Sequence, residues 1–88
     1  MAIKKSGVAK AKDDFKYEVL EKCGVISVGS NGWQMELRYI KWNDNDPKYD
    51  IRSWKENEDG TEKMGKGITL TGEELESLSD VINKMREV

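Results

Sequence analysis

The chain has 88 residues, of which 36% are hydrophobic and 36% are charged, and its formal net charge is -2. A domain of this size buries little apolar surface, so we expect it to associate with a second copy of itself. The absence of histidine and the single cysteine, Cys23, exclude an internal disulfide, the usual zinc sites, and Ser-His or Cys-His catalysis.

The first fourteen residues are rich in Lys, Ala, Ser, Gly and Asp and show no period. We predict that residues 1–14 form a flexible basic tail and that residues 15–88 form one domain. Met1 is followed within a few residues by Lys4 and Lys5 instead of an apolar run, which is not typical of a signal peptide, and no segment is apolar enough to span a bilayer. We therefore expect a cytoplasmic, nucleoid-associated protein.

Alternating apolar residues predict a first strand over Phe15–Val28, with a bend or bulge near Cys23, which we interpret as a packed thiol. A turn over residues 29–32 leads to a second strand that starts at Trp33. Beyond Tyr39 its apolar residues change parity. We expect a twist or a bulge there to leave Trp42 on the side that carries Arg38.

A turn over residues 43–47 precedes a third strand over residues 48–55. In this strand Arg52 and Trp54 share one face. It is the face on which a strand with its other side in the core would carry polar groups. A polar hairpin over residues 56–62 leads to a short fourth strand over residues 68–70. The glycines at 65 and 67 are expected to let the backbone bend or approach another group closely, while Lys63 and Lys66 project from this segment.

The last segment is predicted to be an amphipathic helix. Thr71 and Glu74 have the spacing of a capping box, in which each side chain satisfies a free backbone N–H at the helix start. The apolar stripe that follows is Leu75, Leu78, Val81, Ile82 and Met85. Four strands and one helix predict an α+β fold in which the helix covers one face of the sheet and leaves the other face free.

Aromatic and basic side chains alternate on the strands in a way that is typical of proteins that hold unpaired nucleic acid. Trp42 lies on the parity of Arg38, and Trp54 lies on that of Arg52, so we expect both rings to face solvent as stacking platforms. On this hypothesis, Trp54→Ala weakens binding and leaves the fold intact. The candidate nucleic-acid-binding residues are Arg38, Lys41, Trp42, Lys48, Arg52, Trp54, Lys63 and Lys66.

No coherent catalytic set is present, so we expect neither an enzyme, nor a cofactor, nor a metal site. Residues 60–66 match the glycine and lysine spacing of a P-loop, but Gly67 stands where magnesium needs a Ser or Thr, and a strand follows where a P-loop needs a helix. The aspartates near residue 44 begin like a calcium loop, yet Lys48, Tyr49 and Lys55 occupy positions that such a loop needs for ligands or glycine.

Several segments form a distinctive combination, namely Gly32-Trp33, Trp42-Asn43-Asp44, Pro47-Lys48-Tyr49-Asp50-Ile51-Arg52-Ser53-Trp54 and Gly65-Lys66-Gly67-Ile68-Thr69-Leu70-Thr71. Together with the Glu-rich helix that follows, this combination resembles the C-terminal domain of the transcriptional positive cofactor four family, and its YdbC-like bacterial branch most closely. The resemblance runs from about Phe15 to the C-terminus.

The resemblance implies a four-stranded, curved antiparallel sheet followed by one helix, in a homodimer that binds single-stranded DNA with little sequence preference. It implies roles in transcription regulation, replication or repair, and contacts with proteins of those processes. The family's stacking aromatics correspond to Trp42 and Trp54, and its cations to Lys48, Arg52, Lys63 and Lys66. The helices pair in this family, which implies a dimer interface at Leu75, Leu78, Ile82 and Met85.

Two alternatives stay open. The same rings and cations permit binding of single-stranded RNA, because every base has a face that can stack. The exposed aromatics and the acidic helix also permit a protein-interaction module that docks the transcription machinery. The acidic residues of the hairpin and the sequence pI of about 5.2 weaken the electrostatic attraction to nucleic acid.

Overall fold

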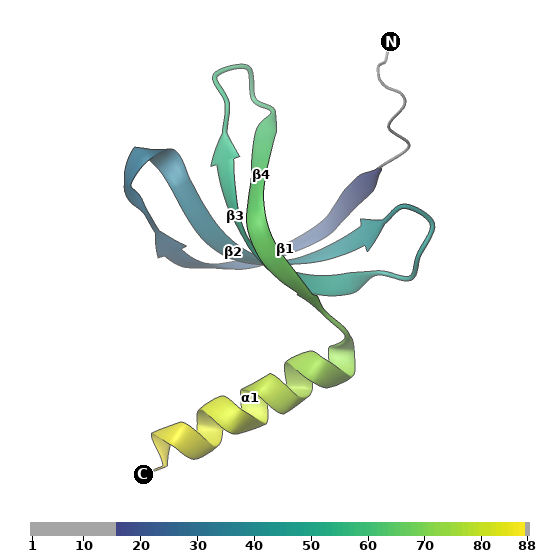
Figure 1. The fold of residues 1–88 in the computed structure, drawn as a ribbon, viewed down its shortest axis with the longest axis vertical. Helices are drawn as coiled ribbons and strands as arrows, with labels where there is room; N and C mark the ends of the chain where they lie inside the picture. The colour runs from purple at the N-terminus through teal and green to yellow at the C-terminus, as the bar shows by residue number, and fades with distance from the viewer. Residues whose placement is uncertain (1–15, 88) are drawn as a thin grey trace.

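The computed structural model describes residues 16–87, which form one antiparallel sheet followed by a helix (Figure 1). The strands are β1 (Tyr17–Val28), β2 (Trp33–Trp42), β3 (Lys48–Glu56) and β4 (Glu62–Leu70), with a short 3-10 turn, η1 (Ser30–Gly32), before β2 and the helix α1 (Gly72–Arg86) at the end. The sheet order is β1-β2-β3-β4. The predicted α+β fold is confirmed, whereas the predicted tail lies outside the described residues.

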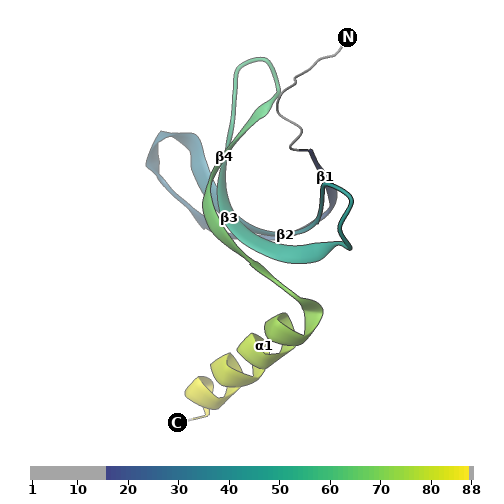
Figure 2. The same cartoon turned by 45° about the vertical axis from the view of Figure 1, so that its right-hand side comes forward.

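Strand β1 is irregular, and this irregularity bends the sheet. Its pairing with β2 shifts register between Val19 and Glu21, between Lys22 and Gly24, and between Val25 and Ser27. Each extra residue increases the local twist of the strand, so the sheet curls (Figure 2). The predicted bulge near Cys23 is confirmed, but the prediction of a packed thiol is wrong, because Cys23 is exposed on this edge strand.

Strand β2 pairs with β3 without interruption, with Arg38 opposite Asp50 and Gln34 opposite Trp54. Side chains that lie directly opposite in a sheet point to the same face. Simple alternation along β2 therefore places Trp42 on the face of Arg38, and no bulge is needed in β2. We call the face that carries Arg38, Asp50 and Trp54 the inner face, and the face that carries Trp33 the outer face.

The centre of the inner face is buried although no second layer formed by residues 16–87 covers it. The largest fully buried side chains, Arg38, Ile40, Asp50 and Trp54, all belong to this face. They shelter one another because the sheet curves around them, and Figure 2 shows this curvature opening away from α1. Ile40 and Trp54 are the buried hydrophobic residues of the described chain, so its apolar core is very small.

Helix α1 begins with the predicted capping box. The Thr71 N–H donates to a Glu74 carboxylate oxygen at 2.9 Å, and the Glu74 N–H donates to the Thr71 hydroxyl at 3.0 Å. The helix extends away from the sheet (Figures 1 and 2), and four of the five residues of its stripe are exposed, from 36% at Leu78 to 69% at Met85, whereas Leu75 at its start is half-buried. The expectation that the helix covers one face of the sheet is therefore wrong within a single chain.

The glycine-rich segment of β4 lets the backbones of β3 and β4 approach closely. The pairing of β4 with β3 shifts register between Arg52, which faces Gly67, and Trp54, which faces Met64. A Cβ atom at Gly67 would lie 2.8 Å from the Cα of Arg52 and closer still to the carbonyl oxygen of Ile51. The expected close approach is thus confirmed at Gly67, where side chains have no room.

We predict that Gly67→Ala destabilises the protein by about 1–3 kcal/mol, because the new methyl group overlaps backbone that cannot move without breaking the ladder. Urea unfolding followed by circular dichroism measures the loss. Gly24→Ala is the matched control, since nothing lies within 4 Å of a Cβ at that position. An equal effect of both substitutions would contradict the steric explanation.

Candidate functional site

Arg38 is the centre of the inner face and is fully buried, with 0% of its surface exposed. Its Nε donates to a Glu36 carboxylate oxygen at 2.8 Å. Its two terminal nitrogens donate to the two oxygens of Glu62 at 2.9 and 2.8 Å, a bidentate pair across the sheet. A buried guanidinium is costly unless it is paired in this way, so both glutamates are required by the position of Arg38.

The charges of this cluster are reflected in its pKa values. Burial lowers the pKa of Arg38, but hydrogen bonds to Glu62 and Glu36 outweigh it, and the pKa ends above its ordinary value. The hydrogen bonds from Arg38 hold the pKa of Glu62 below its ordinary value, and Lys22 adds to this effect from 3.8 Å. Arg38 and Glu62 therefore both stay ionised at neutral pH, and each compensates the charge of the other.

Arg52 forms a second network on the same face. Its Nε and one terminal nitrogen donate to the two Asp50 oxygens at 2.8 Å each, and its other terminal nitrogen donates to the Gly65 carbonyl oxygen at 3.1 Å. The Thr69 hydroxyl donates to Asp50 at 3.0 Å. Hydrogen bonding to Asp50 raises the pKa of Arg52. These contacts fix the guanidinium 5.2 Å from the ring centre of Trp42.

The ring of Trp54 does not face solvent. Its exposed fraction is 2%, and the Arg38 guanidinium carbon lies 3.9 Å from its ring centre, in cation–π contact. The expectation of an open stacking surface at Trp54 is therefore wrong. Alternation alone could not reveal this, because the covering arginine comes from the neighbouring strand and the enclosure comes from the curvature of the sheet.

Tyr17 is an exposed ring at this site that the sequence analysis did not single out. It is 38% exposed and stands between the two indoles, with ring centres 5.7 Å from Trp42 and 5.9 Å from Trp54. Tyr17 lies opposite Trp42 in the ladder, but the bulges of β1 set this register. The alternation of Tyr17 and Val19 was readable from the sequence, whereas the partner of Tyr17 was not.

Two hollows lie next to these rings. The larger, of about 490 Å³, is lined by Tyr17, Lys22, Glu56, Gly60, Thr61 and Glu62. The smaller, of about 180 Å³, shares three of these residues and is lined by Lys22, Gly32, Gln34, Glu36, Trp54, Glu56 and Glu62. The shared residues make the two hollows neighbours, so together they extend from Tyr17 to the edge of Trp54.

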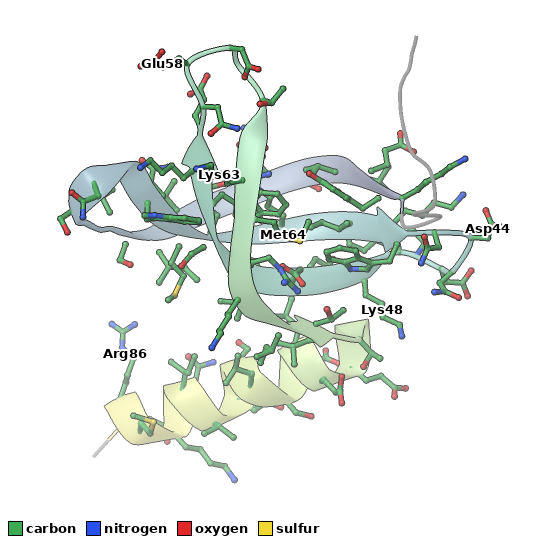
Figure 3. The ribbon with its side chains drawn as sticks, turned by 45° about the horizontal axis from the view of Figure 1, so that its top comes forward. Asp44, Lys48, Glu58, Lys63, Met64 and Arg86 are labelled. Carbon is green, nitrogen blue, oxygen red and sulfur yellow. The ribbon has the colours of Figure 1, made fainter. Side chains whose placement is uncertain are left out.

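The structure brings together some of the eight sequence-predicted binding residues. The strand register puts Arg38, Trp42, Lys48, Arg52 and Trp54 on the inner face. Lys41 and Lys63 have the opposite parity, and Lys63 lies across from Lys55 on the outer face. Lys66 is exposed and has no partner in the ladder. Lys48 lies at the end of the sheet near Asp44, away from the hairpin tip at Glu58 (Figure 3).

Residues 16–87 contain neither a metal-binding cluster nor a membrane-spanning helix. No group of three or more cysteine and carboxylate side chains in this range is arranged to hold a metal ion. No helix in the same range is long and apolar enough to cross a membrane.

Comparison with known proteins agrees with this geometry. The model of the family "Transcriptional Coactivator p15 (PC4)" matches residues 30–81, which is more than half of the chain. The chain belongs to the PC4 family. It is also 46% identical over 85 residues to an uncharacterised protein of Treponema pallidum (strain Nichols), covering 97% of this chain and 94% of that protein. PC4 proteins are transcriptional coactivators that bind nucleic acid, which suits the sheet of rings and cations described above.

We predict that Trp54→Ala lowers the free energy of unfolding by about 3–5 kcal/mol, because it removes a buried aromatic side chain and the surface on which Arg38 rests. Urea unfolding followed by far-UV circular dichroism measures the change. Trp54→Phe keeps a ring under Arg38 and should lose clearly less stability. A fully stable Trp54→Ala protein would show that the ring is not part of the core.

Proposed function

We propose that this PC4-family protein is a homodimeric, nonenzymatic single-stranded DNA-binding protein with little sequence specificity, acting in transcription regulation, replication or repair. The observation that carries the proposal is the curved inner face, on which aromatic rings and cations stand together and over which residues 16–87 place no second layer. A bound strand can lie along such a surface with its bases against the rings.

Stacking is assigned to Tyr17 and Trp42. Tyr17 is the more exposed ring, and Trp42 is half-buried beside it, so a base can reach both. Trp54 is assigned a supporting role and not a stacking role, because the guanidinium of Arg38 already occupies one side of its buried indole. Stacking of a base on an aromatic side chain contributes about 1–3 kcal/mol and does not depend on which base is stacked.

Phosphate contacts are assigned chiefly to lysines, because Arg38 and Arg52 share their charge with buried carboxylates. Lys48 is exposed on the inner face and can meet the backbone of a strand there, whereas the exposed Lys66 lies in the bulge of β4 and adds positive potential at this edge of the sheet. Lys41 and Lys63 contribute positive potential from the outer face. With a net charge of -2 for the whole chain, this electrostatic attraction is local, and stacking supplies a large part of the affinity.

The dimer is assigned to α1 and the outer face. The stripe of α1 is exposed, with Leu78 at 36% and Ile82 at 43%, and on the sheet Met35 is exposed at 39% and Ile68 at 55%. A 15-residue helix is marginally stable unless its apolar face is packed against something. A second copy can cover the predicted interface residues Leu75, Leu78, Ile82 and Met85, and Val81 beside them.

The binding proposal predicts that thymidine oligomers quench tryptophan fluorescence and that Tyr17→Ala weakens their binding by about 1–3 kcal/mol. Affinity should fall as salt rises, because binding releases counterions from the strand. Tyr17→Phe keeps the ring and is the matched control. Duplex DNA and an RNA oligomer of the same sequence serve as competitors. Tighter binding of RNA would favour the RNA alternative, and no binding of any strand would overturn the proposal.

The dimer proposal predicts that the protein has twice the 10.1 kDa chain mass in sedimentation equilibrium and that Ile82→Glu yields a less stable monomer. The new carboxylate would be buried unpaired in the interface, which is strongly unfavourable. Asn83→Glu adds the same charge to the opposite side of α1 and should remain dimeric. A monomeric parent protein, or equal dissociation by both substitutions, would remove α1 from the interface.

A further inference from the structure

The smaller hollow beside Trp54 has the chemistry of a site for a nucleobase and not for a phosphate. Three of its seven lining residues are glutamates, against one lysine, and because Arg38 compensates Glu36 and Glu62, the charge that would repel a phosphate there is that of Glu56. Its volume of about 180 Å³ is small. Pockets for drug-sized ligands occupy roughly 300–1,000 Å³, so this hollow has room for a single ring system and not for a whole nucleotide.

Within the hollow, the carboxylate of Glu56 is the one that is available. Both oxygens of Glu36 accept hydrogen bonds, from Gln34 and Arg38, and both oxygens of Glu62 accept from Arg38. Glu56 is exposed, and no hydrogen bond or ion pair joins its side chain to another residue in the range 16–87.

The position of Glu56 also costs stability. It lies directly opposite Glu62 in the ladder of β3 and β4. Like charges at such a position are destabilising, and the bidentate pair with Arg38 compensates Glu62 alone. The charge of Glu56 therefore does not stabilise the fold, whereas it could accept hydrogen bonds from a ligand that donates them.

A second observation points to the same ligand. The indole N–H of Trp54 is buried and has no acceptor among the described residues, although Trp54 is only 2% exposed and lines the hollow. A buried donor without a partner is costly, so an acceptor that displaced the side chains around this N–H would form a hydrogen bond that residues 16–87 do not supply. The ammonium of Lys22, which also lines the hollow, is a second donor.

From these groups we infer that the hollow binds one guanine base of a bound strand. The Watson–Crick edge of guanine carries two adjacent donors, N1–H and the N2 amino group, which fit the two oxygens of one carboxylate. Its neighbouring O6 is an acceptor for an indole N–H or an ammonium. Thymine offers one donor between two acceptors, and cytosine and adenine each offer an acceptor next to their amino group, so none of them can donate twice to Glu56.

This inference rests on the proposed strand binding and adds a local base preference to it. Stacking on Tyr17 and Trp42 and contacts to the phosphates remain indifferent to sequence. The hollow, beside the β3–β4 hairpin, selects the base at one position of the bound strand for each protein chain.

The test compares fluorescein-labelled thymidine oligomers that differ at one central nucleotide, titrated with the full-length protein. We expect the oligomer with one dG to bind roughly tenfold tighter than the oligomer with only dT, the discrimination of a good bidentate contact. Central dA and dC should behave like dT. Deoxyinosine, which lacks the N2 amino group, should lose most of the advantage of dG.

Glu56→Gln tests the acceptor, because an amide offers one acceptor and one donor where guanine needs two acceptors. The ratio of the dG to the dT affinity should then fall toward one. Glu58→Gln is the matched control, because it removes the same charge from the same hairpin. Glu58 lies at the hairpin tip (Figure 3) and does not line the hollow.

The results distinguish the two proposals. Equal binding of the dG and dT oligomers, or a preference that survives Glu56→Gln, overturns the guanine pocket and leaves strand binding standing. A failure of every oligomer to bind overturns the proposed function, and the pocket with it.

Discussion

A single curved layer must satisfy its own buried charges, and the pairing of Arg38 with Glu36 and Glu62 is how this sheet does so. Residues 16–87 supply no second layer, so the charges that the curvature encloses are paired within the sheet, on the same strand or on another one. The bidentate contact to Glu62 also ties β2 to the start of β4, although β3 lies between them. The geometry of the inner face follows from this requirement.

The same pairing determines which groups can meet a ligand. Arg38 covers the ring of Trp54, so this ring supports the surface instead of contacting a ligand. Asp50 restrains Arg52 beside Trp42. The arginines are thus rigid and largely neutralised, whereas the exposed lysines are free to move with a strand. A surface of this kind is suited to stacking with modest electrostatic attraction, which agrees with a chain whose sequence pI is about 5.2.

The two faces of the sheet have different tasks. The inner face holds charges and rings, and the outer face and α1 carry apolar side chains that one chain leaves exposed, among them Met35, Ile68 and Ile82. Within residues 16–87 the buried hydrophobic residues are Ile40 and Trp54, which make a small core for a domain, so burial of the outer face by a second copy would supply much of the stability. Assembly and ligand binding can then occur on opposite sides without competing.

The sequence by itself determined the features that depend on near neighbours. The alternation of β2 and β3, the capping box of α1 with its apolar stripe, and the close approach at Gly67 could all be predicted, because strand parity, helix capping and the lack of a Cβ act within a few residues. Only the tertiary structure decided that Arg38 covers Trp54, that Tyr17 stands beside Trp42, and that Glu56 and Glu62 line a hollow next to Trp54. Those contacts join different strands through a register that the bulges of β1 and β4 shift, and through a curvature that arises only when all four strands pair.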